Sequence, residues 1–134
     1  MLAIYCRTSK TKKEGQDQSI PTQKMLGIKF AEKKGLEYEI FVDEGISGTG
    51  DDIEDRPQFA EMINLIRKGK INAVYCIDQS RIERNSEIWN FFAGVLLKAK
   101  CEYFPSGKFF DLDVPENKLF AGLVSLTNSF YASL

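Results

Sequence analysis

The sequence contains no histidine, and this absence excludes much of the chemistry that small enzymes use. A serine–histidine–aspartate triad, a cysteine–histidine pair and a histidine-ligated metal site all need an imidazole. The three cysteines, Cys6, Cys76 and Cys101, lie far apart and form no Cys-x-x-Cys pair, which is typical of thiols buried in a reducing cytoplasm. We therefore expect a cytoplasmic protein with no metal ion and no cofactor.

Long apolar runs are missing as well. No run of about eighteen apolar residues occurs, and the N-terminus lacks the basic and then apolar pattern of a secretory signal. The sequence therefore predicts neither a membrane span nor export. Its 134 residues, of which 43% are hydrophobic, suit one domain with a substantial core.

Arginine is scarce, with five residues against thirteen lysines. The net charge of -1, taken alone, argues against a surface that binds nucleic acid. The charge is uneven, because residues 1–36 carry eight Lys/Arg and three acids, whereas residues 37–66 carry one and nine. Four arginines (Arg7, Arg56, Arg81 and Arg84) fall in loops or at the ends of expected elements, where a guanidinium suits bidentate contact with phosphate.

Strand and helix patterns alternate along the chain, which predicts an α/β domain with a mostly parallel sheet and helices on both faces. Ser19 is suited to cap a helix that has Pro21 in its first turn and ends at Gly35. Short strands at 101–105 and 108–112 are expected to form a hairpin. The other expected strands are 2–6, 38–43 and 72–77, and the other expected helices are 57–69 and 87–100.

Residues 115–134 have apolar side chains at steps of three and four, which predicts a long amphipathic helix. The pattern is still periodic at Leu134, so we expect the helix to continue beyond this chain. Such a helix either packs on its own domain or pairs with a second subunit.

Polar residues with reactive side chains follow the first and third expected strands. Tyr5, Arg7 and Ser9 alternate along the first strand and should point the same way. Arg81 and Arg84 are three residues apart and share a face of a helical turn. Because reactive groups gather at the carboxyl ends of parallel strands, four arginines and a serine hydroxyl are expected in one pocket. Phosphoryl transfer needs such a set of cationic donors around an oxygen nucleophile.

Other phosphate-handling classes fit the spacing less well. No GxGxxG or GxxxxGK[ST] loop follows the first strand, so a dinucleotide or P-loop site is not supported. Lys12 stands where a Cys-x5-Arg phosphatase with its nucleophile at Cys6 would need arginine. A response-regulator-like domain would use Asp43 or Asp78 as its phosphate acceptor, and it would leave the arginines unexplained.

Five motifs occur in order along the chain, namely YCRTS, QSIPTQ, FVDEGISGTGDDIEDRPQFAEMI, DQSRIERN and PENKLFAGLVSLTNSFYASL. Together they resemble the catalytic domain of the serine site-specific recombinases (the resolvase/invertase family), most closely the large integrase and transposase branch. The resemblance implies a resolvase-like three-layer catalytic domain over residues 1–114. It also implies the start of a long oligomerisation helix at 115–134, with the DNA-binding domains outside this chain.

The resemblance implies roles for individual residues. Ser9 would attack a DNA phosphodiester, forming a 5′-phosphoserine bond and freeing a 3′-hydroxyl. DNA and further copies of the same chain would be the partners. The scissile phosphate would be bound by Arg7, Arg56, Arg81 and Arg84, with Tyr5, Gln18, Gln23, Asp78 and Ser80 in support.

One motif departs from the family pattern. Many members have Asp-Arg-x-x-Arg, whereas here Ser80 precedes Arg81 and the nearest acid is Asp78. Whether Asp78 takes the role of the family's aspartate is open, and Arg56 has a structural reading as a salt bridge to Asp52 or Asp55. Two other functions stay open: a catalytically inactive recombinase-like assembly module, and a phosphate- or nucleotide-sensing domain without a DNA partner.

Overall fold

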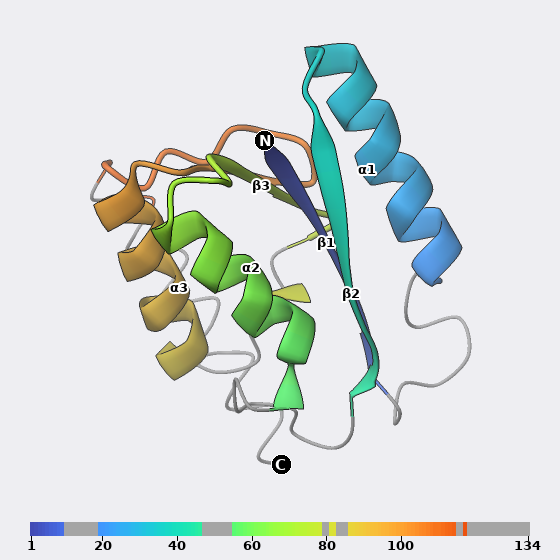
Figure 1. Ribbon diagram of the computed structural model, residues 1–134, viewed down its shortest axis with the longest axis horizontal. Coiled ribbons are helices and arrows are strands. Elements are labelled where there is room, and N and C mark those ends of the chain that lie inside the picture. Colours follow the sequence, from blue (N-terminus) through green and yellow to red (C-terminus); the bar gives the residue numbers. More distant parts are fainter. Residues whose placement is uncertain (10–18, 47–54, 79–80, 83–85, 115–116, 118–134) are drawn as a thin grey trace.

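Four parallel strands form a sheet with the order β2-β1-β3-β4 (Figure 1). The parallel sheet expected from the sequence is confirmed. The computed structural model describes residues 1–9, 19–46, 55–78, 81–82, 86–114 and 117. Its elements are β1 (Leu2–Ser9), α1 (Ile20–Lys34), β2 (Tyr38–Ile46), α2 (Pro57–Arg67), β3 (Ala73–Cys76), α3 (Ser86–Ala99) and β4 (Glu102–Pro105).

Helix α1 lies on one face of the sheet, and α2 and α3 lie on the other (Figure 1). Successive side chains of a strand point to opposite faces of the sheet. The apolar side chains of β1 therefore pack into the cores on both faces. Ile4 and Cys6 belong to the core under α1, whereas Tyr5 belongs to the core under α2 and α3. The Tyr5 ring meets the Phe59 ring of α2 edge-on, at 5.4 Å between centroids. The three-layer arrangement expected from the sequence is therefore confirmed.

The ends of α1 follow the signals in the sequence. The Ser19 hydroxyl accepts a hydrogen bond from the Thr22 amide at 3.2 Å, and Pro21 lies in the first turn. At the other end, Gly35 has a φ of 68°, a left-handed conformation that favours glycine. Both expected ends of this helix are confirmed.

Two strands extend further than the sequence pattern indicates. β1 continues to Ser9 and β2 to Ile46. The register changes between these ends, because Arg7 pairs with Asp43 but Ser9 pairs with Ile46. The additional residue of β2 is accommodated at Gly45, whose φ is 70°, so a glycine allows the bulge.

The hairpin expected after β4 is incomplete. Residues 108–112 form no second strand, although the Phe110 amide donates to the Tyr103 carbonyl at 2.9 Å. The segment instead packs Phe110 and Leu112 against the core that contains α3. The helix expected over 115–134 lies outside the described residues except for Asn117. None of the described helices is long and apolar enough to cross a membrane.

Candidate active site

The carboxyl ends of β1 and β3 mark the point where the sheet changes winding direction. After β1 the chain passes through α1 to β2, and after β3 it passes through α3 to β4 on the opposite side. Ligands of doubly wound sheets bind at such a switch point. The described chain buries five polar or charged side chains, and all of them lie at this edge or in contact with it: Arg7, Gln23, Asp43, Arg56 and Arg81.

Arg7 is held at the end of β1 by the side chain of Gln23 from α1. The Arg7 amide donates to Gln23 Oε1, and Gln23 Nε2 donates to the Arg7 carbonyl, both at 3.1 Å. β3 pairs with β1 only as far as Tyr5 opposite Cys76, so at Arg7 the glutamine amide takes the place of a strand. The Gln23 side chain thus holds the backbone of Arg7 in place.

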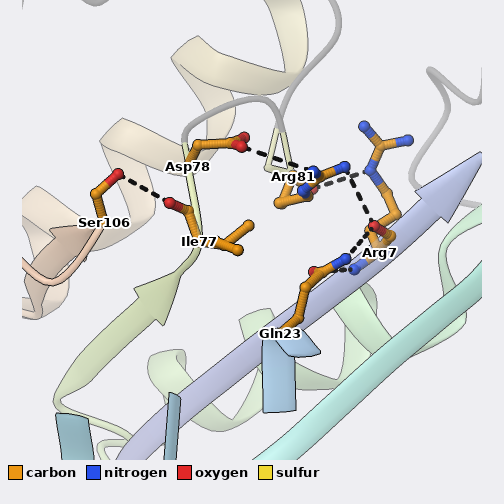
Figure 2. A network of polar contacts seen from close by, with 6 residues as sticks. All are labelled: Arg7, Gln23, Ile77, Asp78, Arg81 and Ser106. Atoms are coloured by element: carbon orange, nitrogen blue, oxygen red, sulfur yellow. Dashed lines mark hydrogen bonds and ion pairs between the residues drawn. The ribbon is translucent and has the colours of Figure 1, made fainter. Parts of the chain in front are cut away.

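Arg81 follows β3 and contacts Arg7 directly (Figure 2). Arg7 Nε donates to the Arg81 carbonyl at 3.0 Å, and Arg81 Nη1 lies 3.5 Å from the Arg7 carbonyl. Asp78 is within the same network, because its Oδ2 lies 3.6 Å from Arg81 Nη2. These contacts join Arg7, Arg81, Gln23 and Asp78 in one group of polar contacts, which we call the arginine network.

Arg56 directly precedes α2, and its side chain reaches the same site. Its side chain is fully buried, and Nη1 donates to the carbonyl of Ile82, the residue after Arg81. The guanidinium also lies over the Phe59 ring, 5.8 Å from its centroid. These contacts fix Arg56 beside Arg81 and leave it within the buried network.

Tyr5 of β1 and Asp43 of β2 form a hydrogen-bonded pair beside the arginines. The Tyr5 hydroxyl donates to Asp43 Oδ2 at 2.8 Å. Burial and the negative charge of Asp43 hold the pKa of Tyr5 well above its usual value, against the opposite effect of Arg56 and Arg7. Tyr5 therefore stays a neutral hydrogen-bond donor and is unsuited to act as a base.

Asp43 has a structural role that the sequence analysis missed. Its Oδ1 accepts from the Gln58 amide at 3.0 Å and its Oδ2 accepts from the Phe59 amide at 2.9 Å. These are orphan amides of the first turn of α2, where a carboxylate is favoured. The signal in the sequence was indirect: the residue before Pro57 is Arg56, and arginine is not one of the usual N-cap residues.

Thr8 links the two strand ends beside Ser9. Thr8 Oγ1 accepts from the Gly45 amide at 3.2 Å, at the position where the register between β1 and β2 shifts. This contact fixes the backbone that leads into Ser9. The side chain of Ser9 and all of Gln18, Ser80 and Arg84 lie outside the described residues, so their expected positions remain predictions.

The three thiols are poor nucleophiles in this structure. Burial raises the pKa of Cys6 to about 11, and it raises the pKa of Cys76 and of Cys101 to about 12. A cysteine nucleophile acts as its thiolate, which these groups do not form near neutral pH. Among the described residues, no group of three His, Cys, Asp or Glu could hold a metal ion.

Buried positive charge gathers at this edge of the sheet. Three buried guanidinium groups, on Arg7, Arg56 and Arg81, accompany one buried carboxylate on Asp43. A phosphate suits the planar fork of arginine.

The family model for the resolvase N-terminal domain matches residues 2–134 of the chain. The chain belongs to the resolvase N-terminal domain family. No curated protein matches it. Membership of the resolvase family supports a general role in site-specific recombination.

Solved structures of this family have the same fold. The N-terminal catalytic domain of TP901-1 integrase is 25% identical, with a TM-score of 0.71, and the match covers 98% of this chain and 96% of that one. A resolvase family site-specific recombinase from Streptococcus pneumoniae is 24% identical, with a TM-score of 0.69 and coverage of 92% and 86%. The C-terminal catalytic domain of ISC1926 TnpA, an IS607-like serine recombinase, is 16% identical, with a TM-score of 0.64 and coverage of 98% and 93%.

Proposed function

We propose that this resolvase-family chain cleaves and rejoins DNA through a covalent bond between Ser9 and a 5′-phosphate. The observation that carries the proposal is the burial of Arg7, Arg56 and Arg81 together at the switch point of the sheet. Ser9 is two residues from Arg7 and closes the same strand. Its hydroxyl is therefore the oxygen nucleophile best placed along the chain to meet a phosphate bound there.

The proposed reaction exchanges one phosphodiester bond for another. Ser9 Oγ attacks the phosphorus, the bond from phosphorus to the 3′ oxygen breaks, and the 3′ oxygen leaves as a hydroxyl after taking up a proton. The bond to Ser9 conserves the energy of the broken link, so rejoining by the 3′-hydroxyl needs no nucleotide cofactor. No histidine is available to accept the serine proton, and the cationic surroundings instead favour the ionised hydroxyl.

The arginines would stabilise charge that develops on the phosphate during transfer. Preorganised donors around the equatorial oxygens are the main requirement of phosphoryl transfer. Arg7 is fixed through Nε, an arrangement compatible with bidentate contact between its Nη atoms and phosphate oxygens. Arg84 would add a fourth cation, and Asp78 would orient Arg81 in place of the aspartate that precedes this arginine in many relatives.

We also propose that DNA and further copies of this chain are its partners. The amphipathic pattern of residues 115–134 supports self-association through a long helix that follows a catalytic domain at 1–114. The chain carries a net charge of only -1, so most of the DNA affinity would come from domains outside it.

A covalent adduct assay tests the proposed reaction directly. The natural full-length protein is mixed with recombination-site DNA that carries a bridging phosphorothiolate and a label on the 5′-phosphate side of the scissile link. We expect a labelled protein adduct with the unchanged protein and none with Ser9→Ala. Ser19→Ala is the matched control, because this serine caps α1 and should leave adduct formation intact.

Each outcome of the assay separates the candidate functions. An adduct formed by Ser9→Ala would contradict Ser9 as the nucleophile. A full-length protein that binds the site but forms no adduct on the activated DNA would favour the inactive assembly module. Absence of DNA binding, together with binding of free phosphate or nucleotide, would favour the sensing domain.

A further inference from the structure

The turn after β4 has a backbone conformation that is unusual for its sequence. Ser106 and Gly107 have φ values of 58° and 79°, and the Lys108 amide donates to the Pro105 carbonyl at 3.2 Å. Glycine adopts left-handed φ values readily, whereas a residue with a Cβ does so at a cost. Among the described residues other than glycine, Ser106 shares a positive φ only with Lys100. A serine at this position therefore needs a compensating interaction.

Ser106 makes two hydrogen bonds to the end of β3. Its amide donates to the Cys76 carbonyl and its Oγ donates to the Ile77 carbonyl, both at 2.8 Å. The strand pairing of β3 with β4 ends at Cys76 opposite Pro105, so the hydroxyl continues the pairing one residue further. Two consecutive carbonyl groups are thereby held, and they fix the direction in which the chain leaves β3.

Asp78, which directly follows Ile77, and Arg81 both belong to the arginine network (Figure 2). The Arg81 amide donates to the Asp78 carbonyl at 3.2 Å, and the two side chains form an ion pair at 3.6 Å. The Arg81 carbonyl in turn receives Arg7 Nε at 3.0 Å. A change in the direction of the chain at Ile77 would therefore move both Asp78 and Arg81 relative to Arg7.

We propose that Ser106 is a positioning residue: through its hydroxyl bond to the Ile77 carbonyl it sets Asp78, which orients Arg81 for contact with the scissile phosphate. The inference rests on the proposed function for the identity of the phosphate, but the positioning itself is a property of the fold. In this proposal Ser106 acts on Arg81 through Ile77, which lies between the two residues in Figure 2, and makes no contact with the phosphate itself.

Lys100 offers a matched control for the backbone effect. It also has a left-handed φ, of 55°, and it precedes β4, whereas Ser106 follows it. Its amide donates to the Leu97 carbonyl at the end of α3, away from the arginines. Replacement by glycine relieves the same backbone cost at both positions, but only Ser106→Gly removes a hydrogen bond to β3.

The first measurement is single-turnover adduct formation by the full-length protein, with DNA affinity and thermal unfolding measured in parallel. Ser106→Gly should slow adduct formation by about tenfold to a hundredfold, the scale for a slightly misplaced group, with DNA affinity and melting temperature nearly unchanged. Lys100→Gly should keep the rate. Ser106→Asn, which tolerates a left-handed φ and retains a donor, should recover part of the lost rate. A wild-type rate for Ser106→Gly, or no recovery with Ser106→Asn, would overturn the proposal.

The second measurement does not depend on DNA cleavage. Hydrogen exchange at the Arg81 amide and at Arg7 Nε should be faster in Ser106→Gly than in the unchanged protein or in Lys100→Gly. Faster exchange in a protein that forms no adduct would contradict the proposed function and retain the positioning role. Unchanged exchange would overturn the positioning role, whatever the protein does to DNA.

Discussion

Helices α1 and α2 both begin at the carboxyl edge of the sheet, but their first turns are held in different ways. α1 is capped locally by the exposed Ser19, which accepts from Thr22 three residues later. α2 is capped by the buried Asp43, which belongs to β2 and also accepts from Tyr5. The cap of α1 is thus local to its own helix, whereas the cap of α2 comes from a side chain beside the arginine network.

The two helices also contribute different chemistry to the site. From α1, Gln23 supplies a neutral amide that satisfies the backbone of Arg7. From the start of α2, Arg56 supplies a buried positive charge beside Ile82. The side chain from α1 therefore orients the end of β1, whereas the side chain at the start of α2 adds positive charge. Substitutions at the starts of the two helices should therefore differ in their effects on adduct formation and on stability.

Replacement of Arg56 by lysine should have the largest effect. A lysine cannot reproduce the planar fork that donates to Ile82 and lies over Phe59. We expect a loss of about 3 kcal/mol of transition-state stabilisation, or roughly a hundredfold in the rate of adduct formation. Single-turnover assays of the full-length protein measure this rate.

Arg67→Lys is the control at the opposite end of the same helix. Arg67 is exposed and lies over the Phe91 ring at 5.2 Å, so its replacement should leave the rate unchanged. Adduct formation by Arg56→Lys within about threefold of the unchanged protein, far below the effect of losing one oxyanion donor, would contradict a role for Arg56 at the phosphate.

The caps of the two helices should differ in their contribution to stability. Asp43→Asn leaves one carboxamide oxygen in place of two acceptors, so a buried amide or hydroxyl donor loses its partner. We expect the free energy of unfolding to fall by about 2 kcal/mol, the scale of a lost bond to a buried charge. Ser19→Ala should cost about 1 kcal/mol, as for an ordinary N-cap.

Denaturant titration of both variants measures this difference. Equal losses would show that the buried carboxylate acts as an ordinary cap and would remove the distinction between the two helix starts. Adduct formation should also fall in Asp43→Asn, because Arg56 directly precedes the turn of α2 that Asp43 caps, and it should be retained in Ser19→Ala.

Local signals made the elements of this fold predictable. Ser19, Pro21 and Gly35 mark the ends of α1 within the sequence that forms it. The positions of Arg7 and Arg81 followed from topology, because parallel strands bring their carboxyl ends to one edge. Helix ends, which depend on adjacent residues, and the meeting of strand ends, which depends on sheet topology, could thus be predicted from the sequence.

Contacts between distant segments could not be predicted in this way. Asp43 caps a helix whose first turn lies fifteen residues later, across an acidic stretch of sequence that gives no spacing rule. The Ser106 hydroxyl binds the Ile77 carbonyl between the ends of the neighbouring strands β4 and β3, whereas the sequence indicated only a turn at Ser106. The expected second hairpin strand was wrong, because the turn after β4 is used to hold β3 and the following segment packs on the core.

Each face of the sheet buries a thiol, and the two thiols should affect the pH dependence of the free energy of unfolding over different ranges. Cys6 lies in the core under α1 with a pKa of about 11, and Cys76 lies under α2 and α3 with a pKa of about 12. Both values exceed the ordinary thiol value of 9.0 that applies to the unfolded chain. Stability from each thiol is therefore fully present below pH 9 and is lost as pH rises toward the folded pKa.

Above pH 9 the unfolded state binds fewer protons than the folded state, so the free energy of unfolding should fall by up to about 1.4 kcal/mol per pH unit for each thiol. Cys6→Ala should remove its share of this slope between pH 9 and 11, and Cys76→Ala should remove a share that extends to pH 12. Denaturant titrations at successive pH values measure both slopes. The cavity that alanine leaves lowers stability equally at every pH, so only the change in slope reports the thiol. A slope that neither variant alters would show that both thiols ionise as readily in the folded protein as in the unfolded chain.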